Sequence, residues 1–436
     1  MSRPEADGTV DAGGAAAGTG VADRPRPSPY LDSAPFQPGD TVRLIAPSGP
    51  TDEESLLRAI GQLESWGLRV VPGANVRARH PRLRYLAGTD EQRRTDLVDA
   101  WCDQDTDAVI ALRGGFGAMR LLDGIDFDLM RRHMLRRDGR PKLLTGSSDI
   151  TALHQAWDHH LGVATLFCPM VGNDPFKNST VVPDEVASWL FHPWGGRELG
   201  FPADESAGAA ESSAGAAADA SADENRSPSD TFGGEKYPMV TTSFSEAVDP
   251  SLKWSKWSQE TAGDVTISTT QDRATEETAA EDTPRPLSRA QTLVPGSAKG
   301  RLGGGNLSLI AAGMGSPELI DVRERRERRG PSILMLEDVD EELYRLDNLM
   351  VQLVRGGWFT SADAVVLGSW EDCAPVHEVE ALMIDYLGGL GIPIVSEMGF
   401  GHDPDAPSAP LGVDVTLEAE PGERPRLWVD HADGQA

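Results

Sequence analysis

The chain has 436 residues, enough for two or three domains. Its 40 basic and 69 acidic residues give a net charge of -29, which disfavours nucleic acid and anionic membrane surfaces as partners, because both repel a negative protein. No uninterrupted apolar run reaches the roughly 18 residues of a transmembrane helix, and residues 1–20 lack the basic and apolar regions of a secretory signal. Three scattered cysteines without a CxxC pair disfavour a disulfide scaffold and a zinc ribbon. We therefore expect a cytoplasmic protein.

The first ordered block is expected over residues 37–200, after an Ala-, Gly- and Pro-rich segment (1–36) that has too little apolar bulk to fold. Apolar runs that end in Gly or Pro predict strands, and apolar residues at helical spacing predict helices between them. Strands that alternate with helices favour an α/β domain with a parallel sheet. Strands are predicted at the start of the segments 41–50, 69–73, 108–117 and 142–149, which run on into turns, and the predicted helices are 52–68, 90–103 and 151–161.

Residues 201–298 are expected to form a long, disordered, acidic insertion. They contain 17 acidic and 7 basic residues, and the stretch 203–230 consists almost entirely of Ala, Ser, Asp, Glu and Gly. Such a composition cannot bury enough apolar surface to offset the entropy of ordering. One island, 237–257, carries aromatic residues, and any function of the insertion is expected there.

A second ordered block is expected over residues 299–432. It contains further apolar strands, one amphipathic helix and a terminal hairpin. The predicted segments are 301–313, the strands 331–341, 363–370 and 392–402, the helix 344–358 and the hairpin 414–429.

A candidate nucleophile lies in LLTGSSDIT (143–151), where a strand is predicted to end at Gly146 and a helix to begin near Asp149. A serine on such a sharp turn exposes its hydroxyl, and the nearby amides and helix dipole favour a developing oxyanion. The pattern lacks the second glycine of GxSxG. The residues alone leave a second interpretation open, in which Ser147 or Ser148 only caps the helix.

A glycine-rich turn follows the strand in ALRGGFGAMRLL (111–122). The backbone N–H groups at Gly114, Gly115 and Gly117 could bind a phosphate or form half of an oxyanion hole. The spacing does not match the dinucleotide motif GxGxxG, and a simple tight turn explains the glycines equally well.

Two more candidates follow predicted strands in the second block. Glu337 ends an apolar strand, at the edge where open α/β sheets bind ligands, and the neighbouring acidic residues lack the spacing of a calcium loop. His402 follows a Gly-x-Gly bend, and a loop histidine can act as a general base near neutral pH. No HExxH or similar spacing occurs, which disfavours a metalloenzyme.

Taken in order, these motifs resemble the LD-carboxypeptidase family of serine peptidases. That family includes hydrolases that trim muropeptides and enzymes that give self-immunity to microcin-type peptide–nucleotide antibiotics. The acidic insertion departs from the family pattern. The shared motifs are LIAPSGP, YLAGTDEQRRTDL, RGGFGAMRLL, GSSDITAL, GGGNLSL, LEDVDEELYRLDNL and GFGH.

The resemblance implies a catalytic triad of Ser148 as nucleophile, Glu337 as the acidic member and His402 as base. It further implies an oxyanion hole made by the backbone amides of Gly115 and Asp149. The implied fold is an N-terminal α/β sheet domain with a smaller, β-rich C-terminal domain, and no cofactor or metal is implied. The implied reaction removes the terminal D-alanine from cytosolic murein tetrapeptides through an acyl-enzyme. The resemblance also implies a homodimer that binds a small peptide substrate.

Two other functions remain open at this stage. The first is an immunity-type amidase that cleaves a peptide–nucleotide toxin with the same triad, for which Trp254 or Trp257 in the insertion could stack on the base. The second is a non-catalytic binding protein on the same fold, which the presence of all three triad residue types disfavours.

Overall fold

The structure is a computed structural model, and its description covers residues 36–173, 176, 178–179, 181–200, 289–317, 319 and 330–431. The predicted disordered segment 1–36, apart from Phe36, lies outside these ranges, as do most of the predicted insertion and the whole aromatic island 237–257. Within the described ranges, no helix combines the length and the hydrophobicity that crossing a membrane would require.

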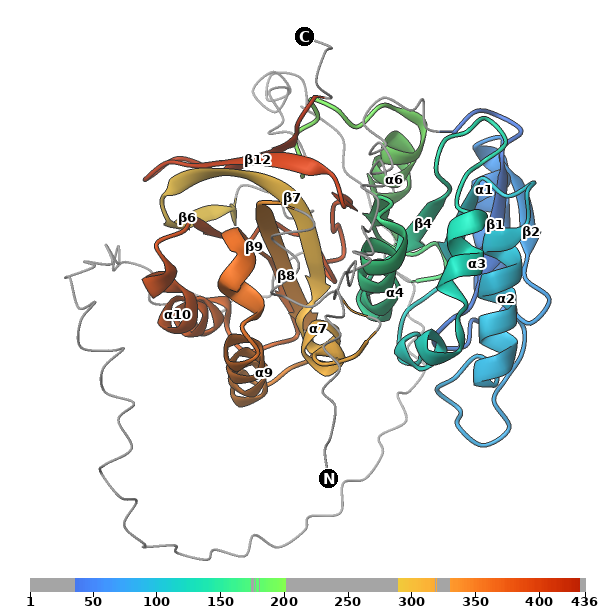
Figure 1. The fold of residues 1–436 in the computed structure, drawn as a ribbon, viewed down its shortest axis with the longest axis horizontal. Coiled ribbons are helices and arrows are strands. Elements are labelled where there is room, and N and C mark those ends of the chain that lie inside the picture. Colours follow the sequence, from blue (N-terminus) through green and yellow to red (C-terminus); the bar gives the residue numbers. More distant parts are fainter. Residues whose placement is uncertain are drawn as a thin grey trace, which may run out of the picture.

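The N-terminal domain is built on a six-stranded sheet with the strand order β11-β5-β4-β3-β1-β2 (Figure 1). Neighbouring strands pair in parallel, except that β11 runs antiparallel to β5. The predicted parallel α/β architecture is thus confirmed. The strands are β1 (Thr41–Ile45), β2 (Arg69–Pro72), β3 (Ala108–Ala111), β4 (Leu143–Gly146), β5 (Thr165–Phe167) and β11 (Ala409–Leu411).

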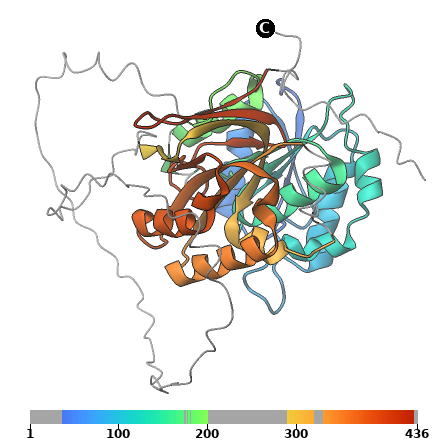
Figure 2. The ribbon, with the colours of Figure 1, turned by 60° about the vertical axis from the view of Figure 1, so that its left-hand side comes forward.

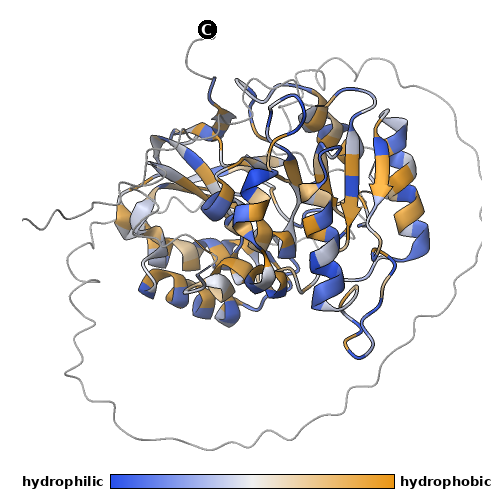
Figure 3. Cartoon of the chain, turned by 45° about the vertical axis from the view of Figure 1, so that its right-hand side comes forward, coloured by the Kyte–Doolittle hydropathy of each residue, from blue (hydrophilic) through white to orange (hydrophobic). Residues whose placement is uncertain are grey.

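Both faces of this sheet are apolar, so helices cover both. In β1, Val42 and Leu44 pack into one buried cluster with α1 and α6, whereas Ile45 packs into a second cluster with α2, α3 and α4. Figure 3 shows the helices alternating hydrophobic and hydrophilic residues beside largely hydrophobic strands. The helices are α1 (Glu53–Ser65), α2 (Asp90–Cys102), α3 (Phe127–Arg132), α4 (Thr151–Ala156) and α6 (Val181–Phe191), with short 3-10 helices η2 (Met119–Gly124) and η3 (Ser148–Ile150) and a π turn η4 (Trp157–Leu161).

The C-terminal domain contains a seven-stranded sheet with the order β13-β12-β7-β8-β9-β10-β6. The four strands β7 to β10 are parallel, and β6, β12 and β13 pair antiparallel at the two edges. The predicted hairpin 414–429 is confirmed as β12 and β13. The strands are β6 (Gln291–Val294), β7 (Gly296–Asn306), β8 (Ser332–Val339), β9 (Ala362–Glu371), β10 (Ile394–Ser396), β12 (Asp414–Ala419) and β13 (Arg426–Val429).

Two predicted boundaries need correction. Residues 289–298 were assigned to the insertion, but they contain β6 and the first residues of β7. The partner of β6 is β10, about a hundred residues later in the chain, so no local pattern marks β6 as part of a sheet. Phe36 was assigned to the disordered segment, but its side chain is buried and its amide donates to the Leu190 carbonyl at 2.8 Å.

The two domains share one continuous apolar core. Three helices, α7 (Leu307–Gly313), α9 (Leu343–Arg355) and α10 (Val376–Leu387), cover one face of the C-terminal sheet. Figures 1 and 2 show α9 and α10 on the side away from the N-terminal domain. The opposite face, with Ile333 and Val366, joins the same cluster as Val42 of β1. Because β11 also enters the N-terminal sheet from the C-terminal half of the chain, neither domain is complete without the other.

One buried carboxylate ties together the loops that follow β1, β3 and β4. Asp149 is fully buried, and its Oδ2 accepts hydrogen bonds from Ser48 Oγ at 2.5 Å and from the Ala118 amide at 2.8 Å. Burial raises the pKa of Asp149, although these donors oppose the shift. Arg93 Nη1 donates to the Gly117 carbonyl at 2.8 Å and holds the same turn from the other side.

We predict that Asp149→Ala destabilises the fold by about 1–3 kcal/mol, because it leaves the Ser48 hydroxyl and the Ala118 amide buried without an acceptor. Asp149→Asn is expected to cost less, since its carbonyl can take the Oδ2 position and its amide the position of Oδ1, which has no hydrogen-bond partner among the described residues. Urea unfolding of both variants checks this. Equal midpoints for Asp149→Ala and the natural protein would contradict it.

Candidate active site

The serine turn is a strained bend between β4 and η3. Gly146 has φ 149°, and a Cβ there would lie 2.8 Å from the Ile150 side chain, so the turn requires glycine. Ser148 has φ 57°, a left-handed conformation that is unfavourable for residues other than glycine and that clusters at functional sites. Ser148 is half-buried, whereas Ser147 is buried. The backbone therefore singles out Ser148 of the two serines.

The capping interpretation of this motif is wrong. Ser147 precedes η3 but makes no capping hydrogen bond with its side chain, and the residue in the N-cap position of α4 is Ile150. The Ser148 hydroxyl is thus not used to start the helix.

The glycine-rich turn lies directly against Ser148. A Cβ on Gly114 would lie 3.1 Å from Ser148 Oγ, so any larger residue there would crowd the serine side chain. The next residue, Gly115, has φ 107°, and its amide makes no hydrogen bond with another described residue. The Asp149 amide stands at the start of η3, where helical N–H groups have no partner within the helix. Both amides that the family resemblance implies therefore belong to the two turns that meet at Ser148.

Glu337 and His402 form a hydrogen-bonded pair in the C-terminal domain. Glu337 lies in β8 with a fully buried side chain, and its Oε2 is 2.6 Å from His402 Nδ1. A Cβ on Gly401 would lie 2.4 Å from Glu337 Oε2, which explains the glycine before the histidine. Ser369 Oγ accepts a hydrogen bond from the His402 amide at 2.9 Å and so fixes the loop that carries the imidazole ring.

The carboxylate raises the pKa of His402. Burial disfavours the imidazolium, but the charge and hydrogen bond of Glu337 outweigh burial, and Asp338 and Glu371 act in the same direction. With Glu337 ionised, Nδ1 carries the hydrogen of the neutral ring and Nε2 is left as a proton acceptor. This is the arrangement that a general base requires.

Asp338, beside Glu337, is engaged in holding the fold. Its carboxylate accepts hydrogen bonds from Asn306 Nδ2 at 2.9 Å and from the Ser308 amide and hydroxyl at 2.9 and 2.7 Å. Burial, followed by the charge of Glu337, raises the pKa of Asp338. Its partners connect the start of α7 to the end of β8, so the acidic run beside Glu337 is in part structural.

The two halves of the candidate site are brought together across the domain boundary. Thr151, in the first turn of α4, accepts a hydrogen bond from the Asn306 amide at 3.0 Å, and Asn306 faces Glu337 in the pairing of β7 with β8. Ser148 and His402 make no hydrogen bond to each other among the described residues. The sequence analysis did not single out Thr151, Asn306 or Ser369, because their partners are far away in the chain.

Other reactive side chains near the turn are inert. His154 is buried between Thr165 Oγ1 and the Gly146 carbonyl, each at 2.8 Å, and burial lowers its pKa to about 4. Burial raises the pKa of the Cys168 thiol, which makes it a poor nucleophile. The described residues contain no cluster of three or more His, Cys, Asp or Glu side chains that could hold a metal ion.

A cavity of about 340 Å³ lies beside the histidine loop, against Ser369 and Asp403. Its volume is in the range of small-molecule sites. The charged residues of its lining are the acidic Glu371, Asp372, Glu397, Asp403 and Asp405 and the basic Arg289.

Comparison with known proteins places both ordered blocks in one family. The pattern of the LD-carboxypeptidase N-terminal domain matches residues 42–168, and that of the C-terminal domain matches residues 299–417. A putative carboxypeptidase of Streptomyces coelicolor is 33% identical over 398 residues, covering 90% of this chain and 96% of that protein. A probable murein peptide carboxypeptidase of Bacillus subtilis is 29% identical over 384 residues, covering 87% and 89% of the two chains.

Solved structures share the fold. Muramoyltetrapeptide carboxypeptidase from Oxalobacter formigenes superposes with a TM-score of 0.58 and 21% identity, covering 89% of this chain and all of that one. The microcin C7 self-immunity protein MccF superposes with a TM-score of 0.61 and 18% identity, covering 92% and 98%. At these identities the likeness establishes the fold alone. The matches in sequence confirm the predicted resemblance: this chain belongs to the LD-carboxypeptidase family and is a serine-type carboxypeptidase.

Proposed function

We propose that this protein removes the terminal D-alanine from murein tetrapeptides with a triad of Ser148, His402 and Glu337. The observation that carries the triad is the 2.6 Å hydrogen bond between the buried Glu337 carboxylate and His402 Nδ1, in a domain whose β7 contacts the helix that follows Ser148. Relatives named for murein peptides support the substrate class.

The proposed reaction is an acyl transfer. His402 Nε2 takes the proton from Ser148 Oγ as that oxygen attacks the scissile carbonyl carbon, and Glu337 stabilises the resulting imidazolium. The amides of Gly115 and Asp149 donate to the oxyanion, where one donor typically lowers the barrier by about 3–4 kcal/mol. The imidazolium then protonates the leaving amine of D-alanine. Water, activated by the neutral His402, hydrolyses the acyl-enzyme.

The charge of the cavity beside His402 favours a murein peptide over a peptide–nucleotide. Five carboxylates and one guanidinium line it, so its potential is negative. A negative potential attracts the free ammonium group of a diamino acid and repels the phosphate or sulfamate of a nucleotide analogue. It equally repels carboxylates, so those of the murein peptide are expected to lie outside this cavity. The immunity-type amidase therefore remains the second candidate, supported by the fold it shares with MccF.

A cytoplasmic location and a homodimer complete the proposal. The homodimer comes from the family resemblance, and the location comes from the composition, since three scattered cysteines accord with a reducing compartment. Sedimentation equilibrium of the purified protein tests the dimer directly.

A substrate panel tests the function. The protein is incubated with a murein tetrapeptide, the corresponding tripeptide and an aminoacyl sulfamoyl nucleotide, and the products are identified by mass spectrometry. We expect loss of one D-alanine from the tetrapeptide and no change in the tripeptide. Cleavage of the nucleotide with an intact tetrapeptide would replace the proposal with the immunity-type function.

We predict that Ser148→Ala abolishes turnover, with a loss on the order of 10⁶-fold in kcat, because the nucleophile is removed. Ser147→Ala, the matched control one residue earlier, is expected to lose far less, since Ser147 is buried and caps nothing. Labelling by a fluorophosphonate gives a second readout. An active Ser148→Ala variant beside an inactive Ser147→Ala variant would reverse the assignment.

The pH dependence of kcat/KM is predicted to follow His402. Catalysis needs the neutral ring, and Glu337 raises the pKa, so activity should fall as the pH drops through an inflection above the ordinary histidine value of 6.5. Glu337→Gln removes the charge that raises the pKa, so its inflection should move to lower pH while kcat falls and KM changes little. An unchanged inflection and rate in Glu337→Gln would exclude Glu337 from the triad.

A further inference from the structure

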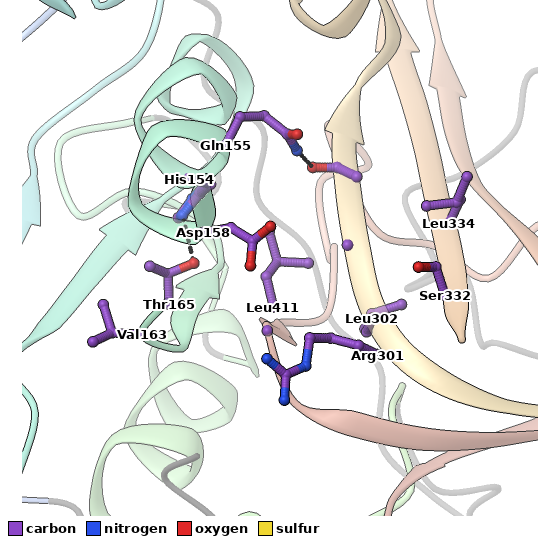
Figure 4. A pocket seen from close by; sticks show the side chains of 13 residues that line it. His154, Gln155, Asp158, Val163, Thr165, Arg301, Leu302, Ser332, Leu334 and Leu411 are labelled. Atoms are coloured by element: carbon purple, nitrogen blue, oxygen red, sulfur yellow. Dashed lines mark hydrogen bonds between the residues drawn. The ribbon is translucent and has the colours of Figure 1, made fainter. Parts of the chain in front are cut away.

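Two hydrogen bonds cross from the helix of the nucleophile turn to the C-terminal sheet. Thr151 Oγ1 accepts from the Asn306 amide at 3.0 Å, and Gln155 Nε2 donates to the Gly304 carbonyl at 2.9 Å. Thr151 and Gln155 are four residues apart, so they lie on the same face of the helix. Both side chains are buried. Figure 4 shows Gln155 reaching from α4 to the backbone of β7.

The end of β7 is shaped to allow this approach. Gly304 and Gly305 have φ of 124° and 132°, a backbone conformation that other residues rarely adopt. A Cβ on Gly305 would lie 2.6 Å from Thr151 Oγ1, whereas a Cβ on Gly303 would meet nothing within 4 Å. Glycine is therefore required at Gly305, where β7 meets Thr151, whereas the space around Gly303 would admit a side chain.

The cavity beneath these bonds is not a ligand site. It has a volume of about 30 Å³ and is lined by residues of both domains, among them Asp158, Arg301 and Leu411 (Figure 4). A space of this size holds about one water molecule. The contact between α4 and β7 is thus a packed interface. It binds no ligand itself, so any role in function lies in the positions that it gives to neighbouring residues.

Each partner of the Thr151–Asn306 bond leads directly to the candidate triad. Thr151 follows Ser148 by three residues, in the first turn of the helix. Asn306 faces Glu337 in the strand pairing, and its side chain also binds the neighbouring Asp338 at 2.9 Å. Because no hydrogen bond joins Ser148 to His402 among the described residues, the elements that carry them set their separation.

We propose that Thr151 is a positioning residue, whose hydrogen bond to the Asn306 amide fixes Ser148 relative to the Glu337–His402 pair across the domain boundary. The inference rests on the triad proposed above and adds a residue outside it. A misplacement of about 1 Å can reduce an enzymatic rate by 100-fold even when every reacting group is present. Thr151→Val retains the shape of the side chain but removes the acceptor, so it isolates the hydrogen bond from the packing.

The test compares Thr151→Val, Thr151→Ser and Gly303→Ala with the natural protein. The readouts are the rate of phosphonylation of the serine by a fluorophosphonate, in which the Oγ–P bond forms as fluoride leaves, and kcat and KM on the murein tetrapeptide. We expect Thr151→Val to lose about 10- to 100-fold in phosphonylation rate and in kcat, with KM nearly unchanged. Thr151→Ser should restore both rates, and Gly303→Ala should leave them unchanged.

A merely structural contact would give a different result. Thr151→Val would then unfold at lower urea but react at the natural rate while folded, and this outcome overturns the proposal. If Thr151→Val does not fold, Thr151→Ala removes the same acceptor, and a natural rate in that variant while folded overturns the proposal equally. Failure of the natural protein to be labelled would refute the triad and the inference with it, whereas normal labelling of both the natural protein and Thr151→Val refutes the inference alone.

Discussion

The site depends on the apolar core that the two sheets share. That core runs from Val42 in the first strand to Val429 in the last, and above it the helix that follows β4 contacts the end of β7, which pairs with β8 at Glu337. Ligand sites in open parallel sheets form at such strand ends. Here the ends belong to two sheets, so each supplies only part of the chemistry. The serine stands on one sheet, and the carboxylate–imidazole pair stands on the other.

Backbone strain marks the same strand ends. Four residues other than glycine have a positive φ, among those the structure describes: Ser148, Asp340, Asp372 and Glu397. Each follows the carboxyl end of a parallel strand, β4, β8, β9 and β10 in turn. Such conformations persist only where the surrounding packing imposes them, and they concentrate at functional sites. The packing that holds Ser148 in this state includes the Asp149 carboxylate and the close approach of Gly114.

The sequence predicts the elements of this fold better than their partners. Apolar periodicity is local, so the helices 52–68 and 90–103 are confirmed nearly at their predicted bounds, and the strands around them begin at the predicted residues. The strand β11 is missed because it pairs with β5, more than two hundred residues earlier. Residue types and spacing leave the choice between Ser147 and Ser148 open. The family resemblance implies Ser148, and the positive φ of Ser148 supports that choice.

The site shows the same division between local and distant information. Glu337 and His402 are 65 residues apart, and only the family resemblance joins them before the structure does. The hydrogen-bond partner of Thr151 is 155 residues away in the chain. The glycines at the end of β7 that leave room for Thr151 look in the sequence like those of an ordinary turn. Candidate catalytic residues can thus be recognised in the sequence by their residue type. The residues that position them can be recognised only from the contacts that they make in the structure.

The burial of the Glu337 carboxylate affects the energy difference between the resting enzyme and the transition state of the proposed reaction. Glu337 is fully buried, and its Oε1 has no hydrogen-bond partner among the described residues, so the carboxylate is poorly solvated beside the imidazole. In the proposed reaction the proton of Ser148 moves to His402 and places a full positive charge 2.6 Å from Oε2. The pair is then stabilised more strongly in the transition state than in the resting enzyme, and only such a difference accelerates the chemical step. A better-solvated Glu337 would stabilise the fold and lose part of this difference.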